Sequence, residues 1–251
     1  MDKDNFLAVD VGNTSISLGL FTKGKLIRKT SLPTDRFEPV ALQKKRSFVH
    51  HVKATFISSV VPDKTDLLKD TLQTLTRSPV KVIGQDIRVP IRNKTRYPRQ
   101  VGTDRLLGAL QAFQTYKTAC IIIDFGTAIT FDVVSRSGEY RGGIIAPGVD
   151  LVLNALYEKA ALLPRIRLTH PRDLIGDTTI ECIRSGVSFG LGALCEGILK
   201  RLKQRLKHPL HVLATGGYAR YMSRYTRNMG HIDENLILKG IYTLYQRAFR
   251  L

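Results

Sequence analysis

Residues 120–134, Cys120-Ile-Ile-Ile-Asp124-Phe-Gly126-Thr127-Ala-Ile-Thr-Phe-Asp-Val-Val134, contain the pattern around which the chain is organised. An apolar run leads into Asp124, a glycine follows at Gly126, and apolar and polar residues then alternate with the period of two that is typical of a strand. The stretch therefore predicts a strand, a tight turn and a second strand. The turn combines a carboxylate, a glycine whose backbone can approach a ligand closely, and the hydroxyl of Thr127. Such groups suit a phosphate and its counter-ion.

The N-terminal stretch 6–21 repeats this order of residues. An apolar run leads into Asp10, Gly12 follows, and the polar pair Asn13 and Thr14 precedes an alternating strand. Taken singly, either turn fits an ordinary hairpin. The two aspartates lie 114 positions apart (124 − 10), and a device that occurs twice in 251 residues predicts two related halves facing one cleft. Two such turns can clamp a polyphosphate, with Asp10 holding Mg²⁺ directly or through water.

Composition indicates a compact globular protein. The chain is 43% hydrophobic, which suffices for one large domain or two of ordinary size. It contains no run of about 18 apolar residues, and its first residues lack the layout of a secretory signal. We therefore expect a cytoplasmic protein without a membrane partner. The three cysteines form no Cys-x-x-Cys motif and fall in apolar patterns, so we expect reduced, packed thiols.

The formal net charge of +18 raises the question of nucleic-acid binding. In the basic run 200–207, leucines recur at helical spacing, which favours the solvated face of an amphipathic helix over a binding stripe. The basic run 88–105 surrounds the expected substrate cleft, where positive potential attracts an anionic substrate and ATP. We therefore expect no nucleic-acid partner.

The predicted elements occur twice in a similar order, three antiparallel strands followed by helices alternating with strands. The first half has strands at 6–11, 15–21, 25–32, 54–58 and 80–83 and helices at 38–47, 62–75 and from 103. The second half has strands at 120–123, 128–134, 139–145 and 210–214 and helices at 149–159, from a capping box at Thr178 and Glu181, and from about 234. This order predicts an α/β fold of two lobes that meet near Lys117.

A carboxylate and a guanidinium lie side by side at Asp104 and Arg105, where a helix is expected to begin. An aspartate at a helix start is often the N-cap, a role worth ~1 kcal/mol. Alternatively, Asp104 can take the proton from an attacking hydroxyl. Arg105 would then bind an anionic substrate or the transferring phosphoryl group.

Six motifs extend the pattern along the chain. They are Asp10-Val-Gly-Asn-Thr14, Gly102-Thr-Asp-Arg105, Asp124-Phe-Gly-Thr-Ala128, Arg141-Gly-Gly-Ile-Ile-Ala-Pro-Gly148, Gly176-Asp-Thr-Thr179 and Ser185-Gly186. In order and approximate spacing they resemble those of type III pantothenate kinases, over residues 6 to about 217. This resemblance implies the fold of the acetate and sugar kinase, heat-shock chaperone and actin superfamily. We expect an α/β fold with two ribonuclease-H-like lobes, 1–117 and 118–251, around an ATP cleft.

The resemblance also implies roles for individual residues. The expected ATP contacts are Asp10, Val11, Gly12, Asn13, Thr14, Ser15, Ile16, Ser17 and Thr127, with Gly216 and Gly217 near the base or ribose. The expected pantothenate contacts are Gly102, Thr103, Asp104, Arg105 and Thr179. Asp124 corresponds to the ligand of a monovalent cation, K⁺ or NH₄⁺. Family members usually carry a substrate-contacting tyrosine where this chain has Thr95, and Tyr97, next to Pro98, is the alternative candidate.

The resemblance implies ATP-dependent phosphorylation of pantothenate to 4′-phosphopantothenate, the first step of coenzyme A biosynthesis, with Asp104 as proton acceptor. It also implies a homodimer, for which the glycine-containing helix after Thr179 is the expected interface. The alternative is a regulatory or nucleic-acid-binding protein on a kinase-like fold, because the family includes members first described as accessory factors of gene regulation. Aromatic residues are not interleaved with the basic runs, which disfavours that alternative.

Overall fold

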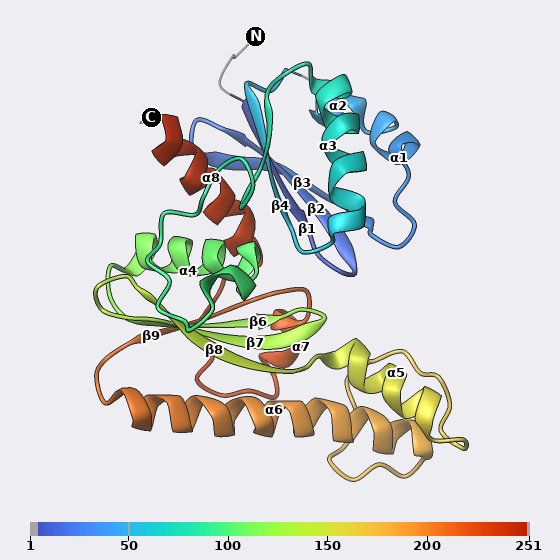
Figure 1. Ribbon diagram of the computed structural model, residues 1–251. Helices are drawn as coiled ribbons and strands as arrows, with labels where there is room; N and C mark the ends of the chain where they lie inside the picture. The colour runs from blue at the N-terminus through green and yellow to red at the C-terminus, as the bar shows by residue number, and fades with distance from the viewer. Residues whose placement is uncertain (1–4, 50, 250–251) are drawn as a thin grey trace. The chain divides into compact units, whose positions relative to one another are not determined.

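The computed structural model describes residues 5–49 and 51–249. The chain divides into two compact units. Unit 1 comprises Met1–Lys117, Gly138–Arg141 and Asn235–Leu251, and unit 2 comprises Thr118–Ser137 and Gly142–Glu234. Each unit contains one five-stranded sheet with helices packed on it (Figure 1).

Unit 1 contains β1 (Asn5–Val11), β2 (Ser15–Thr22), β3 (Lys25–Pro33), α1 (Pro39–Gln43), α2 (Arg46–Val49), β4 (Ala54–Ser59), α3 (Pro62–Thr76), β5 (Val80–Val82), the 3₁₀ helix η1 (Pro98–Gln100), α4 (Thr103–Tyr116) and α8 (Leu236–Phe249). Unit 2 contains β6 (Cys120–Phe125), β7 (Ala128–Val134), α5 (Val149–Lys159), α6 (Thr179–Leu206), β9 (His211–Thr215), α7 (Ala219–Met222) and β10 (His231–Ile232). Strand β8 (Tyr140–Pro147) begins in the part of the chain assigned to unit 1 and continues in unit 2.

The two sheets follow the same plan. Their strand orders are β3-β2-β1-β4-β5 and, read from the corresponding edge, β8-β7-β6-β9-β10. In each sheet the central strand pairs antiparallel with the next strand of its meander and parallel with a later strand. The duplicated meander expected from the two Asp-Gly turns is thus confirmed, and the mixed α/β class with it.

The two faces of the unit 1 sheet are covered by different helices. Leu7 and Val9 point to one face, where they share a buried cluster with Leu68 of α3. Phe6 and Ala8 alternate to the other face and pack with residues of α4 and α8. Figure 1 shows α3 and α8 on the two sides of the sheet. The alternation places Asp10 on the α4/α8 face, at the end of β1.

Helix α6 is 28 residues long and packs along the sheet of unit 2. Its side chains Ile183, Val187 and Leu191 lie buried against the sheet, with Phe125 and Phe131 in the same cluster. Among the described residues, α6 is also the one helix long and apolar enough to cross a membrane. Its buried face in the core of unit 2 accounts for that composition without a membrane.

Most predicted elements occur at the expected places, with three differences. The helix predicted at 38–47 is two short helices, α1 and α2, because the chain turns at Lys44 and Lys45. The short elements η1, α7 and β10 had no clear signal in the sequence. The helix expected from about 234 is α8, and it belongs to the compact unit 1, because its aromatic face packs on the α4/α8 side of that sheet. The division into lobes 1–117 and 118–251 stays a prediction.

Candidate active site

Three polar side chains gather at one end of the unit 1 sheet. Asp10 in β1 lies opposite Ser17 of β2 and opposite Ser58 of β4. Residues opposite one another in a sheet point to the same face, so all three side chains share the α4/α8 face. Ser58 is fully buried, and the side chains of Asp10 and Ser17 are half-buried.

The start of α4 is joined to this polar end by a hydrogen bond. The hydroxyls of Ser58 and Thr103 lie 3.1 Å apart, and either can donate. Thr103 is the first residue of α4, so the bond fixes the Gly102 to Arg105 segment over the face that carries Asp10. The structure therefore brings together, within one unit, two motifs that lie about 90 residues apart in the sequence.

Asp104 is not the helix N-cap. Gly102 occupies the N-cap position, and Asp104 is the second residue of α4. Its Oδ1 accepts a hydrogen bond of 2.8 Å from the backbone N–H of Arg105. A Cβ at Gly102 would collide with that carboxylate oxygen, so the glycine leaves room for it. The half-buried carboxylate of Asp104 lies in the first turn of α4, at the helix end where the dipole attracts negative charge.

Arg105 is oriented by an aromatic ring. Its guanidinium carbon lies 5.9 Å from the ring centroid of Tyr140, within the range of a cation–π contact. Tyr140 is fully buried, so the ring is a rigid support. Sequence reasoning missed Tyr140. The feature that could have drawn attention to it is an aromatic residue at the start of β8, the third strand of the second meander.

The first Asp-Gly turn is fixed from its buried side by Thr34. The Thr34 hydroxyl donates to the carbonyl of Gly12 at 2.8 Å, and the backbone N–H of Thr34 donates to the carbonyl of Thr14 at 3.1 Å. The turn is closed by a 3.0 Å bond from the N–H of Gly12 to the carbonyl of Ser15. Asn13, Thr14 and Ser15 are exposed, whereas Val11 and Ile16 are buried. The turn thus presents polar groups outward, and Thr34 is a further residue that sequence reasoning missed.

The second Asp-Gly turn lies at the corresponding end of the unit 2 sheet. Asp124 is opposite Thr130 of β7 and Thr215 of β9, so these side chains share a face. Gly216 has a φ of +92°, and a Cβ there would collide with Oδ1 of Asp124. The carboxylate therefore occupies a space that exists because residue 216 has no side chain.

Helix α5 begins directly against this second turn. A Cβ at Gly148, the N-cap of α5, would collide with the carbonyl oxygens of Gly126 and Thr127. In the first turn of α5, Asp150 accepts a 2.6 Å hydrogen bond from the hydroxyl of Tyr218, which follows β9. Burial, and then the neighbouring Asp150 carboxylate, hold the pKa of Tyr218 above its usual value of 10.0. Tyr218 therefore stays a hydrogen-bond donor at neutral pH.

Thr179 is the exposed first residue of α6. Oγ1 of Thr178 accepts a hydrogen bond from the N–H of Glu181 at 3.2 Å, which is one of the two hydrogen bonds of a capping box. The Glu181 carboxylate instead accepts from the N–H of Arg172 at 3.1 Å and from the guanidinium of Arg184 at 2.7 Å. These hydrogen bonds, that of Arg172 first, lower the pKa of Glu181.

The loop before η1 is organised by Asn93. Its Oδ1 accepts hydrogen bonds from the N–H and hydroxyl of Thr95 at 3.0 and 2.8 Å, and its Nδ2 donates to the carbonyl of Pro98. Thr95 is therefore tied into an Asx turn. Tyr97 is 56% exposed, with the Arg96 guanidinium over its ring. Of the two candidates for the family's tyrosine position, Tyr97 has the side chain that reaches solvent.

Part of the basic run 88–105 is neutralised locally. Glu139 forms ion pairs with Arg92 and Arg141, both at 3.3 Å, and with Lys94 at 3.8 Å. The sequence alone did not show this network, because Glu139 is distant from Arg92 and Lys94 along the chain. Two of the cations in this run thus have a structural role.

The donor sets near the two aspartates differ from a protein-made metal cage. Among the described residues, no three His, Cys, Asp or Glu side chains gather as a metal site. One carboxylate, at Asp10, beside hydroxyls suits a Mg²⁺ ion that takes its other oxygens from phosphates and water. At Asp124, the carboxylate and the two threonines that share its face, Thr130 and Thr215, offer oxygen donors of the kind that hard cations take.

Comparison with known proteins gives a consistent result. A family model described as type III pantothenate kinase matches residues 6–201. A relative from Citrifermentans bemidjiense named type III pantothenate kinase is 35% identical over 253 residues, covering 96% of this chain and 98% of the relative.

Two solved structures resemble the fold. A conserved putative Baf family transcriptional activator from Campylobacter jejuni has a TM-score of 0.60 at 20% identity, covering 98% of this chain and 100% of that one. A ROK family glucokinase from Streptomyces griseus has a TM-score of 0.54 at 13% identity, covering 96% and 98%. At these identities the likeness shows the fold alone, a mixed α/β fold of two ribonuclease-H-like units.

Proposed function

The chain belongs to the type III pantothenate kinase family, and from this premise we propose which of its residues carry out the reaction. The activity is ATP-dependent phosphorylation of pantothenate in coenzyme A biosynthesis, the transfer of a phosphoryl group to an alcohol. The Campylobacter jejuni neighbour is named a transcriptional activator, but at 20% identity that likeness shows the fold alone and does not favour the alternative of a nucleic-acid-binding regulator.

One observation carries the residue assignment within unit 1. The 3.1 Å contact between the Ser58 and Thr103 hydroxyls ties the start of α4 to the face and the end of the sheet that carry Asp10. A phosphate-binding turn and a general-base candidate on one rigid support are what phosphoryl transfer needs, because this chemistry depends mainly on positioning and charge stabilisation.

In the proposed reaction Asp104 accepts the proton of the primary hydroxyl of pantothenate while the hydroxyl oxygen attacks the γ-phosphorus of ATP in line. The bond from that phosphorus to the β–γ bridging oxygen breaks, and ADP leaves with that oxygen. Arg105, oriented by Tyr140, binds the pantothenate carboxylate. The backbone and polar side chains of residues 10–17 hold the triphosphate of ATP, as does Thr127 in unit 2. Gly102, Thr103 and Thr179 complete the pantothenate contacts, and Tyr97 is favoured over Thr95 because its side chain is exposed.

Two cations fit the residues present. Mg²⁺ would be held by Asp10, and a monovalent cation, K⁺ or NH₄⁺, by Asp124. When bound, they neutralise the negative charge of the phosphates. The half-buried carboxylates at the ends of β1 and β6 would orient them through oxygen contacts.

The exposed surface of unit 2 supports a homodimer. Gly186 and Gly190 of α6 have open space where a Cβ would stand, and Phe189 between them is 37% exposed. In the loop between α5 and α6, Leu162 and Ile175 are 94% and 84% exposed. An apolar surface of this kind favours burial against a second copy. Light scattering should give twice the chain mass of 28.1 kDa, and a mass of one chain would contradict the dimer. We place the enzyme in the cytoplasm.

The test is ADP release that depends on pantothenate, measured for the parent chain, Asp104→Asn and a matched control, Asp63→Asn. Asp63 also lies in the first turn of a helix, α3, and is not among the proposed site residues, so the control loses a similar dipole interaction. We expect kcat to fall about 10²- to 10⁴-fold in Asp104→Asn, the range for a lost general base. The control should retain the parent rate.

Each outcome separates one part of the proposal from another. Turnover that persists in Asp104→Asn would remove the general base but keep the kinase. Loss of turnover when Na⁺ replaces K⁺ would support the cation site. So would a loss of turnover in Asp124→Asn that a high K⁺ concentration partly restores. Equal rates in K⁺, NH₄⁺ and Na⁺ would contradict it.

A further inference from the structure

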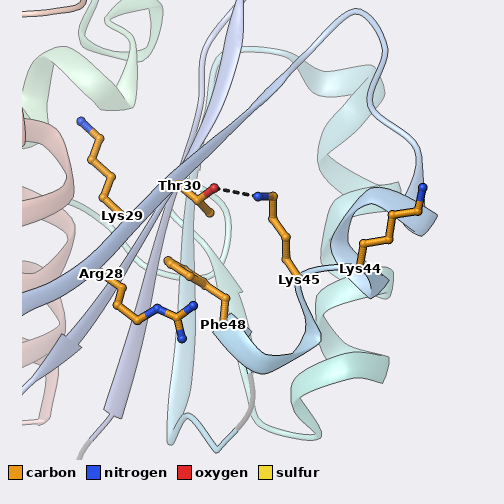
Figure 2. Close-up of a pocket in the computed structure, with 6 residues that line it drawn as sticks. All are labelled: Arg28, Lys29, Thr30, Lys44, Lys45 and Phe48. Atoms are coloured by element: carbon orange, nitrogen blue, oxygen red, sulfur yellow. Dashed lines mark hydrogen bonds between the residues drawn. The ribbon is translucent and has the colours of Figure 1, made fainter.

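A cluster of cationic side chains lines a pocket of about 380 Å³ in unit 1 that has no part in the proposed reaction. The residues of this basic pocket are Arg28, Lys29, Thr30, Lys44, Lys45 and Phe48 (Figure 2). None of these described lining residues is acidic. The pocket lies between the edge strand β3 and the α1–α2 turn, two elements that are separate in the sequence.

The side chains that face one another in the pocket are held in place by neighbours. Nζ of Lys45 donates to Oγ1 of Thr30 at 2.9 Å. The Arg28 guanidinium lies over the ring of buried Phe48, 4.9 Å from its centroid. Figure 2 shows Arg28, Thr30, Lys45 and Phe48 turned toward one another, whereas Lys29 points to the other side of β3. Two cations are thus preorganised, which lowers the entropy lost on binding.

The pocket lies on the opposite face of the sheet from the phosphate turn. Thr30 is opposite Leu18, and Arg28 is opposite Leu20, both of which point to the α1–α3 face. Asp10 and Ser17 point to the α4/α8 face. ATP held by the Asp10 turn therefore leaves the basic pocket open.

We propose that the basic pocket is a second, non-catalytic binding site for a phosphate-bearing small molecule. A phosphate presents several acceptor oxygens and can engage a guanidinium, an ammonium and a hydroxyl at once. An ammonium has three donors, so Lys45 can hold Thr30 and an anion together, and the Thr30 hydroxyl can still donate its own proton. The volume admits an organic group beyond the phosphate. The net charge of +18 raises the encounter rate with such anions.

The test uses inorganic pyrophosphate as the probe, titrated calorimetrically into the full-length protein without ATP or an ATP analogue, because a triphosphate would compete for the same pocket. The pocket variant is Arg28→Gln with Lys45→Gln. The matched control is Lys25→Gln with Arg77→Gln, two exposed cations of unit 1 outside the pocket, which changes the net charge equally. We expect the pocket variant to bind about tenfold or more weakly, as expected for lost charge-assisted contacts, and the control to match the parent within about twofold.

Pantothenate-dependent turnover should be the same in both variants, because neither pair belongs to the proposed site. Lys45→Gln alone leaves the Arg28–Phe48 contact intact and should show part of the loss of pyrophosphate affinity if the double variant unfolds.

A sugar phosphate titrated in parallel distinguishes the possible ligands. Tighter binding than pyrophosphate identifies an organic phosphate, and equal binding identifies the free anion. The absence of pyrophosphate binding, or equal weakening in both double variants, would overturn the proposal. So would displacement of pyrophosphate by a single-stranded oligonucleotide whose own affinity falls in the pocket variant, because the ligand would then be nucleic acid.

Discussion

The three thiols of this chain differ in accessibility. Cys120 and Cys195 are buried, as the sequence predicts, but Cys182 is exposed, with its Sγ directed at the carbonyl of Gly176. That exposure corrects the expectation of three packed thiols. Cys182 falls on the outer side of the amphipathic α6, a distinction that an apolar pattern around it did not reveal.

We predict that Cys120 and Cys195 resist alkylation in the folded protein. Burial raises the pKa of the Cys120 thiol to about 11, and burial, with the charge of Glu196, raises that of Cys195 to about 12. The reactive thiolate is therefore scarce at pH 8. In a Cys182→Ser background, maleimide should label no thiol until urea unfolds the protein, and then two. Labelling within minutes in the native state would contradict the burial of one of them.

The same pKa values have a consequence for stability. Each folded pKa lies above the usual 9.0, so the folded state binds protons more tightly than the unfolded state. The contribution of these thiols is therefore fully present below about pH 9 and is lost as the pH rises toward the folded values. Cys195→Ala should flatten the alkaline decline of the unfolding temperature.

At the scale of elements, the start of α6 depends on a carboxylate that holds the preceding loop. Glu181 bonds the Arg172 N–H, and the hydroxyl of Ser185 donates to the carbonyl of Leu174. A Cβ at Gly176 would collide with the backbone of Cys182, so the loop lies tightly against the helix. The segment that leads to Thr179 is thus supported along its length.

We predict that Glu181→Gln raises the KM for pantothenate about tenfold, because the loop beside Thr179 loses a charge-assisted hydrogen bond. The kcat and the KM for ATP should change little. The matched control is Glu196→Gln in the same helix. It removes the charge from a carboxylate that accepts a 2.7 Å hydrogen bond from the N–H of Arg227, away from Thr179. Steady-state kinetics decide the matter. A KM change of equal size in both variants would indicate general destabilisation.

The lowered pKa of Glu181 gives this prediction a pH dependence. Its contribution to stability is present above the usual value of 4.5 and is lost as the pH falls through the lower folded pKa. The difference in unfolding temperature between the parent and Glu181→Gln should therefore shrink in acid. A difference that is constant from neutral pH to pH 3 would contradict the role of the carboxylate charge.

Local patterns predicted elements well but not the partners of side chains. The period of two around Asp10 and Asp124 correctly predicted strands β1, β2, β6 and β7, and Thr178 correctly predicted the start of α6, because these signals are local. Glu181 was expected to bond back to its own N-cap and instead bonds a loop residue nine positions earlier. Thr34 and Tyr140 support the site through tertiary contacts, which no spacing rule encodes.

At the scale of the whole molecule, the C-terminal helix returns to the first sheet. Tyr245 stacks on Phe6 with ring centroids 4.1 Å apart, and Tyr242 stacks on Phe21 at 4.6 Å. A Cβ at Gly240 would collide with the carbonyl of Leu107 in α4, so the two helices approach closely. The amphipathic pattern of residues 236–249 predicts a buried face, but it does not state which sheet that face covers.

We therefore predict that the fragment 1–117 does not fold alone, whereas the same fragment joined by a flexible linker to 235–251 does. Without α8, the aromatic side chains of Phe6 and Phe21 face water, and each stacked pair is worth ~0.5–1.5 kcal/mol beyond the area that it buries. The joined fragment should unfold cooperatively on heating. The matched control is the joined fragment with Tyr242→Ala and Tyr245→Ala, which keeps chain length but loses both stacks and should resemble 1–117. A cooperative transition in 1–117 at the temperature of the joined fragment would show that the first sheet is complete without α8, and the boundary expected near Lys117 would then divide two independent folding units.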